Sequence, residues 1–142
     1  MDSAQLLSLT GALRGKQVVV IGDVVADEFV YGRVARVSRE APVLILEYNS
    51  SEIVPGGAGN AANNIAALGG RATLVALVGR DEPGRRLVSA LHRGVDPRLL
   101  RVPSMPTPVK TRILAGGVHS AKQQVVRIDR GVAPQITPRV RA

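Results

Sequence analysis

The residues of this sequence best suited to chemistry form a glycine-dense stretch that opens into a helix, Pro55-Gly-Gly-Ala-Gly-Asn-Ala-Ala62. The free backbone N–H groups and the dipole of a helix start favour oxygen-rich ligands such as sugar hydroxyls or phosphates. Gly56 and Gly57 allow a ligand to approach the backbone closely, and Asn60 offers both a donor and an acceptor. The same residues also suit a helix-initiating turn packed against a sheet, and local physics leaves the two interpretations balanced.

The segment 57–62 also satisfies the G-x-G-x-x-A form of the dinucleotide-binding fingerprint. That fingerprint should follow a strand immediately. Here the strong hydrophobic strand, residues 18–21, lies more than 30 residues earlier, and Pro55 stands where a strand should feed the turn. We therefore disfavour a dinucleotide site.

A second candidate is the pair of carboxylates in Gly22-Asp-Val-Val-Ala-Asp27, just beyond the first predicted strand. Ligands of open α/β sheets bind at the carboxyl ends of the strands. An ionised Asp is acceptor-only, so it can take hydrogen bonds from two vicinal sugar hydroxyls. Either Asp can instead cap a helix or turn. We expect Asp23 to be a cap and Asp27 to bind a ligand.

The elements that must position these residues follow from the hydrophobic pattern. The apolar run 17–22, rich in β-branched residues, is typical of a central strand buried on both faces. Two strand-like pieces, 29–34 and 42–48, predict a small antiparallel flap. Pro55, Gly56 and Gly57 are expected to break the chain before the next helix. The other predicted elements are helices over 4–13, 58–68 and 81–92 and strands over 72–78, 99–102, 109–115 and 123–128, the last strands returning to the flap with Gly116 and Gly117 in a turn.

Composition supports one α/β domain. Of the 142 residues, 45% are apolar, yet there is one Phe, two Tyr and no Trp, so the core must consist of Val, Leu, Ile and Ala. The absence of Cys excludes disulfides, thiolate metal sites and cysteine nucleophiles. No apolar run reaches the roughly 18 residues that span a bilayer, and the N-terminus lacks a leader pattern. We expect a cytoplasmic protein without a membrane partner.

The net charge of +8 is unevenly distributed. Residues 1–84 carry seven basic and nine acidic side chains, whereas residues 85–142 carry twelve basic and two acidic ones. The basic residues form no run and are not interleaved with aromatic residues, so a nucleic-acid partner is disfavoured. The asymmetry fits a basic partner surface or an acidic remainder outside the sequence.

The glycine-dense stretch also carries a family resemblance. The stretch Gly56-Gly-Ala-Gly-Asn-Ala-Ala62 is followed by six residues and Gly69, and then by nine residues and Gly79. In residues and spacing this pattern resembles the N-terminal signature of ribokinase-like (phosphofructokinase-B type) carbohydrate kinases. Residues 19–43, 107–114 and 123–129 are similar to heptose-7-phosphate kinases of lipopolysaccharide-precursor synthesis. The resemblance covers roughly residues 16–131. It implies the N-terminal half of a ribokinase-like three-layer α/β/α sheet, as one domain over 1–142, with lid strands near 29–48 and 107–130.

The resemblance also assigns a substrate site. It implies sugar contacts for Asp27, Gly56, Gly57 and Asn60, and Asn64, one helical turn after Asn60, is expected to face the same site. Strand alternation puts Lys110 and Arg112 on one face, where they can meet a sugar phosphate or can simply form a solvated surface. The predicted partners are a sugar or sugar-phosphate substrate and a second copy bound through the flap.

The implied reaction is ATP-dependent phosphorylation of a sugar or sugar phosphate with Mg²⁺, for the heptose subgroup at the anomeric hydroxyl of heptose 7-phosphate. The family's catalytic Asp, in a Gly-Ala-Gly-Asp motif, and its nucleotide site have no counterpart in this sequence, so we assign no catalytic and no metal-binding residue. We expect a fragment without the nucleotide-binding half. A non-catalytic sugar-phosphate-binding or dimerising module, or an inactive truncated remnant, are the alternatives.

Overall fold

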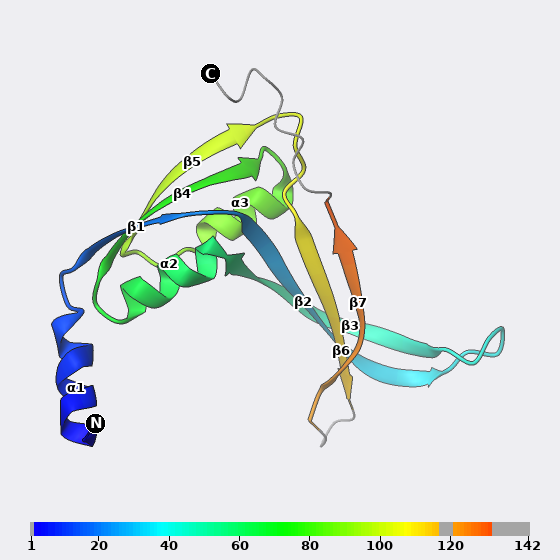
Figure 1. Ribbon diagram of the computed structural model, residues 1–142. Coiled ribbons are helices and arrows are strands. Elements are labelled where there is room, and N and C mark those ends of the chain that lie inside the picture. Colours follow the sequence, from blue (N-terminus) through cyan, green and yellow to red (C-terminus); the bar gives the residue numbers. More distant parts are fainter. Residues whose placement is uncertain (1, 117–120, 132–142) are drawn as a thin grey trace.

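The computed structural model describes residues 2–116 and 121–131 as three helices and two β-sheets (Figure 1). Gly117, one of the two glycines of the predicted turn, and the segment after residue 131 lie outside the described residues. The observed elements match the predicted order and are, along the chain, α1 (Ser3–Ala12), β1 (Gln17–Ile21), β2 (Val24–Val37), β3 (Leu44–Gly57), α2 (Ala58–Ala67), β4 (Arg71–Gly79), α3 (Glu82–Ser89), β5 (Val95–Val102), β6 (Val109–Gly116) and β7 (Gln123–Arg130).

The first sheet is parallel, in the order β1-β4-β5, and the crossovers that join its strands contain α2 and α3. Alternate residues of β4 are buried, which is the pattern of a sheet covered on one face. Small residues of α2, such as Ala62 and Ala66, lie in the same core as Leu74 and Leu87. Among the described residues, the buried hydrophobic side chains other than Met105 belong to Val, Leu, Ile and Ala.

The prediction that β1 is a central strand buried on both faces is wrong. β1 pairs only with β4 and lies at the sheet edge within the described residues. Val20 packs against the core, but Val19 and Ile21 are 63% and 77% exposed. On the neighbouring strands Val75 and Leu100 are exposed as well. One face of this sheet therefore carries large aliphatic side chains that no described element covers.

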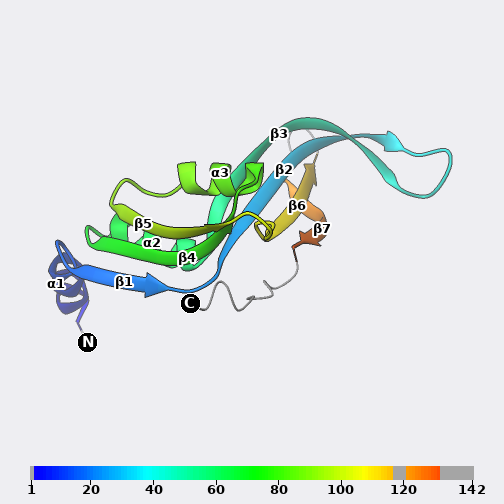
Figure 2. The ribbon, with the colours of Figure 1, turned by 90° about the horizontal axis from the view of Figure 1, so that it is seen from above.

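The second sheet has the order β3-β2-β6-β7. β2 and β3 form a long antiparallel hairpin, β6 runs parallel to β2, and β7 is antiparallel to β6. This confirms that the later strands join the predicted flap, although β2 and β3 are much longer than the short pieces expected from the sequence. The sheet projects away from the helices (Figures 1 and 2). No helix among the described residues is long and apolar enough to cross a bilayer.

The glycine-dense turn joins β3 directly to α2. The break predicted over Pro55, Gly56 and Gly57 occurs at Gly57, whereas Pro55 itself lies within β3 in register with Ala26. β3 is an edge strand, where a missing N–H is tolerated. Gly57 has φ 58° and ψ −129°, and a Cβ there would overlap the carbonyl oxygen of Asp23. The N–H of Ala58 donates to that oxygen at 2.9 Å, so the start of α2 is attached to the β1–β2 junction.

Asp81 attaches the start of α3 to the segment that leads into β6. Its carboxylate accepts hydrogen bonds from the Gly84 N–H at 3.0 Å and from the Thr107 N–H and hydroxyl at 2.8 and 2.6 Å. The Thr107 hydroxyl in turn accepts from the Gly79 N–H. Burial raises the pKa of Asp81, but these hydrogen bonds outweigh burial and hold it below its ordinary 3.8. This network therefore positions the first residues of β6.

Replacing Asp81 by Asn should lower the free energy of unfolding by about 1–3 kcal/mol, because an amide cannot accept all three hydrogen bonds. The depressed pKa means that the ionised carboxylate stabilises the fold above pH 3.8 and that this contribution is lost as the pH falls through the folded-state pKa. Urea denaturation at several pH values tests this. Asp96→Asn, at an exposed carboxylate, is the control. Equal pH dependence in wild type and D81N would contradict the assignment.

Replacing Gly57 by Ala should destabilise the protein by about 1–3 kcal/mol, because the substitution adds both a positive-φ strain and an overlap with backbone. Gly11→Ala is the matched control, since a Cβ at Gly11, inside α1, meets nothing within 4 Å. That variant should be neutral or slightly more stable. Thermal unfolding of both variants measures the difference, and a G57A protein as stable as wild type would refute the proposed constraint.

Candidate functional site

The site is centred on Asp27 in β2. Its Oδ1 accepts a hydrogen bond from Arg112 Nη1 at 2.7 Å, and each of the two side chains is 24% exposed. Its Oδ2 lies against Gly56 of β3, where a Cβ would overlap it. The carboxylate thus occupies space that only glycine leaves open. The structure therefore brings together Asp27, Gly56 and Arg112, three of the residues that the sequence analysis selected.

Strand register explains why β6 supplies the cations. Asp27 is paired with Lys110 and Phe29 with Arg112 in the parallel β2–β6 ladder, so these four side chains project from the same face. The guanidinium of Arg112 reaches diagonally to Asp27 and lies over the Phe29 ring, with its Cζ 5.3 Å from the centroid. Lys110 makes no ion pair with any described residue. Of these two β6 cations, Arg112 is in an ion pair with a described residue and Lys110 is not.

The same face continues along β2 and β3 with residues that the sequence analysis did not select. Phe29 supports Arg112, and the Tyr31 hydroxyl donates to Glu52 across the hairpin. That hydrogen bond, followed by slight burial and the nearby charge of Glu52, raises the pKa of Tyr31. The Nζ of Lys122 lies 4.6 Å from the Tyr31 ring centroid. Counting every second residue from Asp27 would have found both aromatic residues.

Glu28 lies on the opposite face of β2 and fastens the strand to its neighbours. Its Oε2 accepts from the Thr111 hydroxyl at 2.7 Å and from Arg130 Nη2 at 2.9 Å. Its Oε1 lies 3.7 Å from Nη1 of Arg86 in α3. These contacts hold β6, β7 and α3 against β2. Glu28 therefore stabilises the strand that presents Asp27, a role for which the sequence held no local signal.

The predicted asparagines belong to α2. Asn60 and Asn64 are exposed and adjacent, with the Asn64 Nδ2 donating to the Asn60 Oδ1 at 3.4 Å. Asn63, on another side of the helix, donates to the Ala90 carbonyl and accepts from the His92 N–H, so it is a structural residue. No hydrogen bond among the described residues joins Asn60 or Asn64 to Asp27. Their ligand role stays a prediction.

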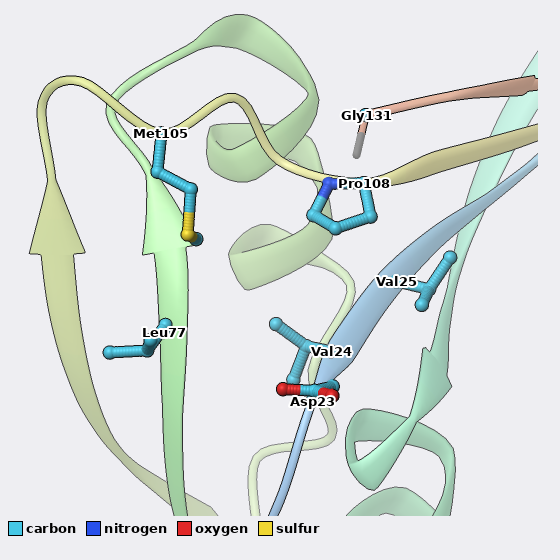
Figure 3. A pocket seen from close by; sticks show the side chains of 7 residues that line it. All are labelled: Asp23, Val24, Val25, Leu77, Met105, Pro108 and Gly131. Carbon is cyan, nitrogen blue, oxygen red and sulfur yellow. The ribbon is translucent and has the colours of Figure 1, made fainter. Parts of the chain in front are cut away.

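Asp23 borders a small pocket between the two sheets. The pocket, of about 150 Å³, is lined by Asp23, Val24, Val25, Leu77, Met105, Pro108 and Gly131 (Figure 3). The expectation that the Asp23 side chain caps a helix or turn is wrong, because its carboxylate makes no hydrogen bond within residues 2–116 and 121–131. It is the Asp23 backbone carbonyl that meets α2. The pocket is smaller than the roughly 300 Å³ of a typical ligand site.

The described residues present no cluster of metal-ligating side chains. They contain no group of three or more His, Asp or Glu side chains that could hold a metal ion. The first helical N–H of α2, at Ala58, already donates to Asp23. We therefore derive no chemical step through ATP or Mg²⁺ from these side chains. What they can do is accept hydrogen bonds from hydroxyls and attract an anion.

Sequence comparison identifies relatives of this chain. Residues 16–138 match the model of the pfkB family of carbohydrate kinases. The chain is 49% identical over 114 residues to a bifunctional protein HldE of Gluconacetobacter diazotrophicus, covering 79% of this chain and 22% of that protein. It is 42% identical over 132 residues to a bifunctional protein HldE of Caulobacter vibrioides, covering 92% and 26%. The chain thus spans about a quarter of the length of these relatives.

Solved structures show the same fold. A carbohydrate kinase from Agrobacterium tumefaciens superposes with a TM-score of 0.60 at 24% identity, over 81% of this chain and 35% of the other. The phosphofructokinase-2 from Escherichia coli in complex with fructose-6-phosphate gives 0.57 at 20% identity, over 86% and 38%. These findings confirm the family resemblance and the ribokinase-like fold expected from the sequence.

Proposed function

The chain belongs to the pfkB family of carbohydrate kinases, and from this membership we propose that it forms the sugar-binding part of an ATP-dependent kinase that phosphorylates heptose 7-phosphate at the anomeric hydroxyl. The chain spans about a quarter of its curated relatives and just over a third of the solved kinases. The activity of a whole kinase, its substrate and its nucleotide are therefore all parts of this proposal.

The observation that carries the proposal is the combination of groups around Asp27. A carboxylate presents acceptors for sugar hydroxyls, and Arg112 and Lys110 beside it present cations for a phosphate. Gly56 leaves room for this carboxylate, since a Cβ at that position would overlap its Oδ2. A ligand with both hydroxyl groups and a phosphate matches this arrangement better than a neutral sugar or a simple anion does.

The choice of heptose 7-phosphate rests on the resemblance of residues 19–43, 107–114 and 123–129 to heptose-7-phosphate kinases. Two of these segments contain Asp27, Lys110 and Arg112. The relatives that match at 42–49% identity bear the name HldE. Within this chain the side chains assigned above bind and orient the substrate. In a complete kinase, bound ATP with Mg²⁺ would be the phosphoryl donor. A further residue would act as the base for the hydroxyl. A cytoplasmic location stays a prediction.

Replacing Asp27 by Ala should weaken binding of heptose 7-phosphate by about 10- to 100-fold, because hydrogen bonds to an ionised group contribute roughly 1.5–3 kcal/mol. Calorimetric titration of the purified chain with heptose 7-phosphate, ribose and fructose 6-phosphate measures this effect. Asp96→Ala removes an exposed carboxylate on β5 and should bind like wild type. A D27A protein that is folded and binds as tightly as wild type would exclude Asp27 from the site.

We also infer a homodimer through the second sheet. Val37 and Leu44 are paired at the end of the β2–β3 hairpin and are 59% and 46% exposed. On β7, Val125, Val126 and Ile128 are exposed too. These exposed aliphatic side chains, at the hairpin end and on the outer strand β7, support the inference.

Sedimentation equilibrium should therefore find dimers of the wild-type chain. The double variant V37K/L44K should be monomeric, because it would bury two cations at the interface. The exposed pair Asp96 and Arg98, exchanged for Lys and Glu, is the matched surface control and should leave the dimer intact. A wild-type chain that sediments as a monomer at high concentration would contradict the inference.

A further inference from the structure

Asp27 and Arg112, which we assign to ligand binding, form an ion pair with each other in this structure. Arg112 Nη1 donates to Asp27 Oδ1 at 2.7 Å, and both side chains are about three-quarters buried. Neither group is free. Sugar hydroxyls must compete with the guanidinium for Asp27, and a phosphate must compete with the carboxylate for Arg112. The site therefore contains an internal competitor for each half of its ligand.

We propose that the Asp27–Arg112 ion pair is an exchangeable latch that makes the site select phosphorylated over neutral sugars. A sugar phosphate replaces both partners together, because its hydroxyls donate to Asp27 while its phosphate takes Arg112. A neutral sugar can replace only Arg112, and it leaves the guanidinium without an anion. This inference rests on the proposed function, since it concerns the same site.

The surroundings of the pair favour exchange over a permanent structural link. Arg112 lies over the Phe29 ring, which holds the guanidinium beside the site even when Asp27 releases it. The Asp27 Oδ2 faces the glycine Gly56 rather than a second cation. Only one hydrogen bond therefore has to be exchanged. In contrast, Glu28 on the other face is held by Thr111 and two arginines and is the anchored carboxylate of the strand.

Lys110 provides an internal comparison. It stands opposite Asp27 in the β2–β6 register but makes no ion pair with a described residue. Lys110 can attract a phosphate without first breaking an ion pair. If the latch exists, variants of Lys110 and Arg112 should differ in their effect on neutral sugars although both remove one positive charge.

Calorimetric titration of the full chain with heptose 7-phosphate, the corresponding neutral heptose and inorganic phosphate tests the latch. Arg112→Gln should weaken sugar-phosphate binding about 10-fold or more, yet strengthen neutral heptose binding about two- to five-fold, the range expected for releasing a partly exposed ion pair. Lys110→Gln should weaken sugar-phosphate binding and leave neutral heptose unchanged. Asp27→Asn should bind inorganic phosphate about two- to five-fold more tightly than wild type. Thermal unfolding verifies that each variant is folded.

The outcomes separate the latch from the proposed function. If wild type binds heptose 7-phosphate but R112Q binds neutral heptose no better, the latch is overturned and the sugar site stands. If no sugar binds to wild type, the proposed function fails. Where sugar does bind, an inorganic phosphate affinity that is unchanged in Asp27→Asn would also overturn the latch, because it would show that Asp27 does not compete for Arg112.

Discussion

The rest of the structure depends on one backbone contact, between the carbonyl of Asp23 and the turn at Gly57 and Ala58. The carbonyl accepts the Ala58 N–H and lies where a Gly57 side chain would otherwise stand. This contact joins the passage from β1 into β2 to the passage from β3 into α2. Both sheets and a helix meet there. Because only glycine permits the approach, this junction between the two sheets requires a glycine at position 57.

Because side chains alternate along β2, the neighbouring carboxylates of Asp27 and Glu28 lie on opposite faces and have different roles. Asp27 projects from the face that carries Lys110 and Arg112, whereas Glu28 projects towards α3 and is held by Thr111 and two arginines. The anchored residue keeps the strand in place, and the residue next to it stays exchangeable. These ion pairs explain part of the uneven charge distribution, because acidic residues before position 84 pair with arginines after it. A basic partner surface is not needed to account for these arginines.

Sequence alone determined most of the elements. Hydrophobic runs and glycine stops located each helix and strand to within a few residues, except where β2, β3 and β5 extend beyond their strongest stretches. The motif from Gly56 to Ala62 identified the family, because its glycines serve a backbone geometry that few other residues permit. Period-two alternation was sufficient to place Lys110 and Arg112 on one face, since that period is a property of the strand itself.

Only the tertiary structure decided which residues from distant segments meet. The apolar sequence of β1 predicts burial on both faces, but only the tertiary structure decides whether another layer covers Val19 and Ile21. The expected cap at Asp23 is supplied by the backbone rather than the side chain, a difference that residue type does not encode. The pairing of Asp27 with Arg112, 85 residues later, depends on the parallel register of β2 and β6. Register is set by the packing of whole strands, and so no local pattern could reveal it.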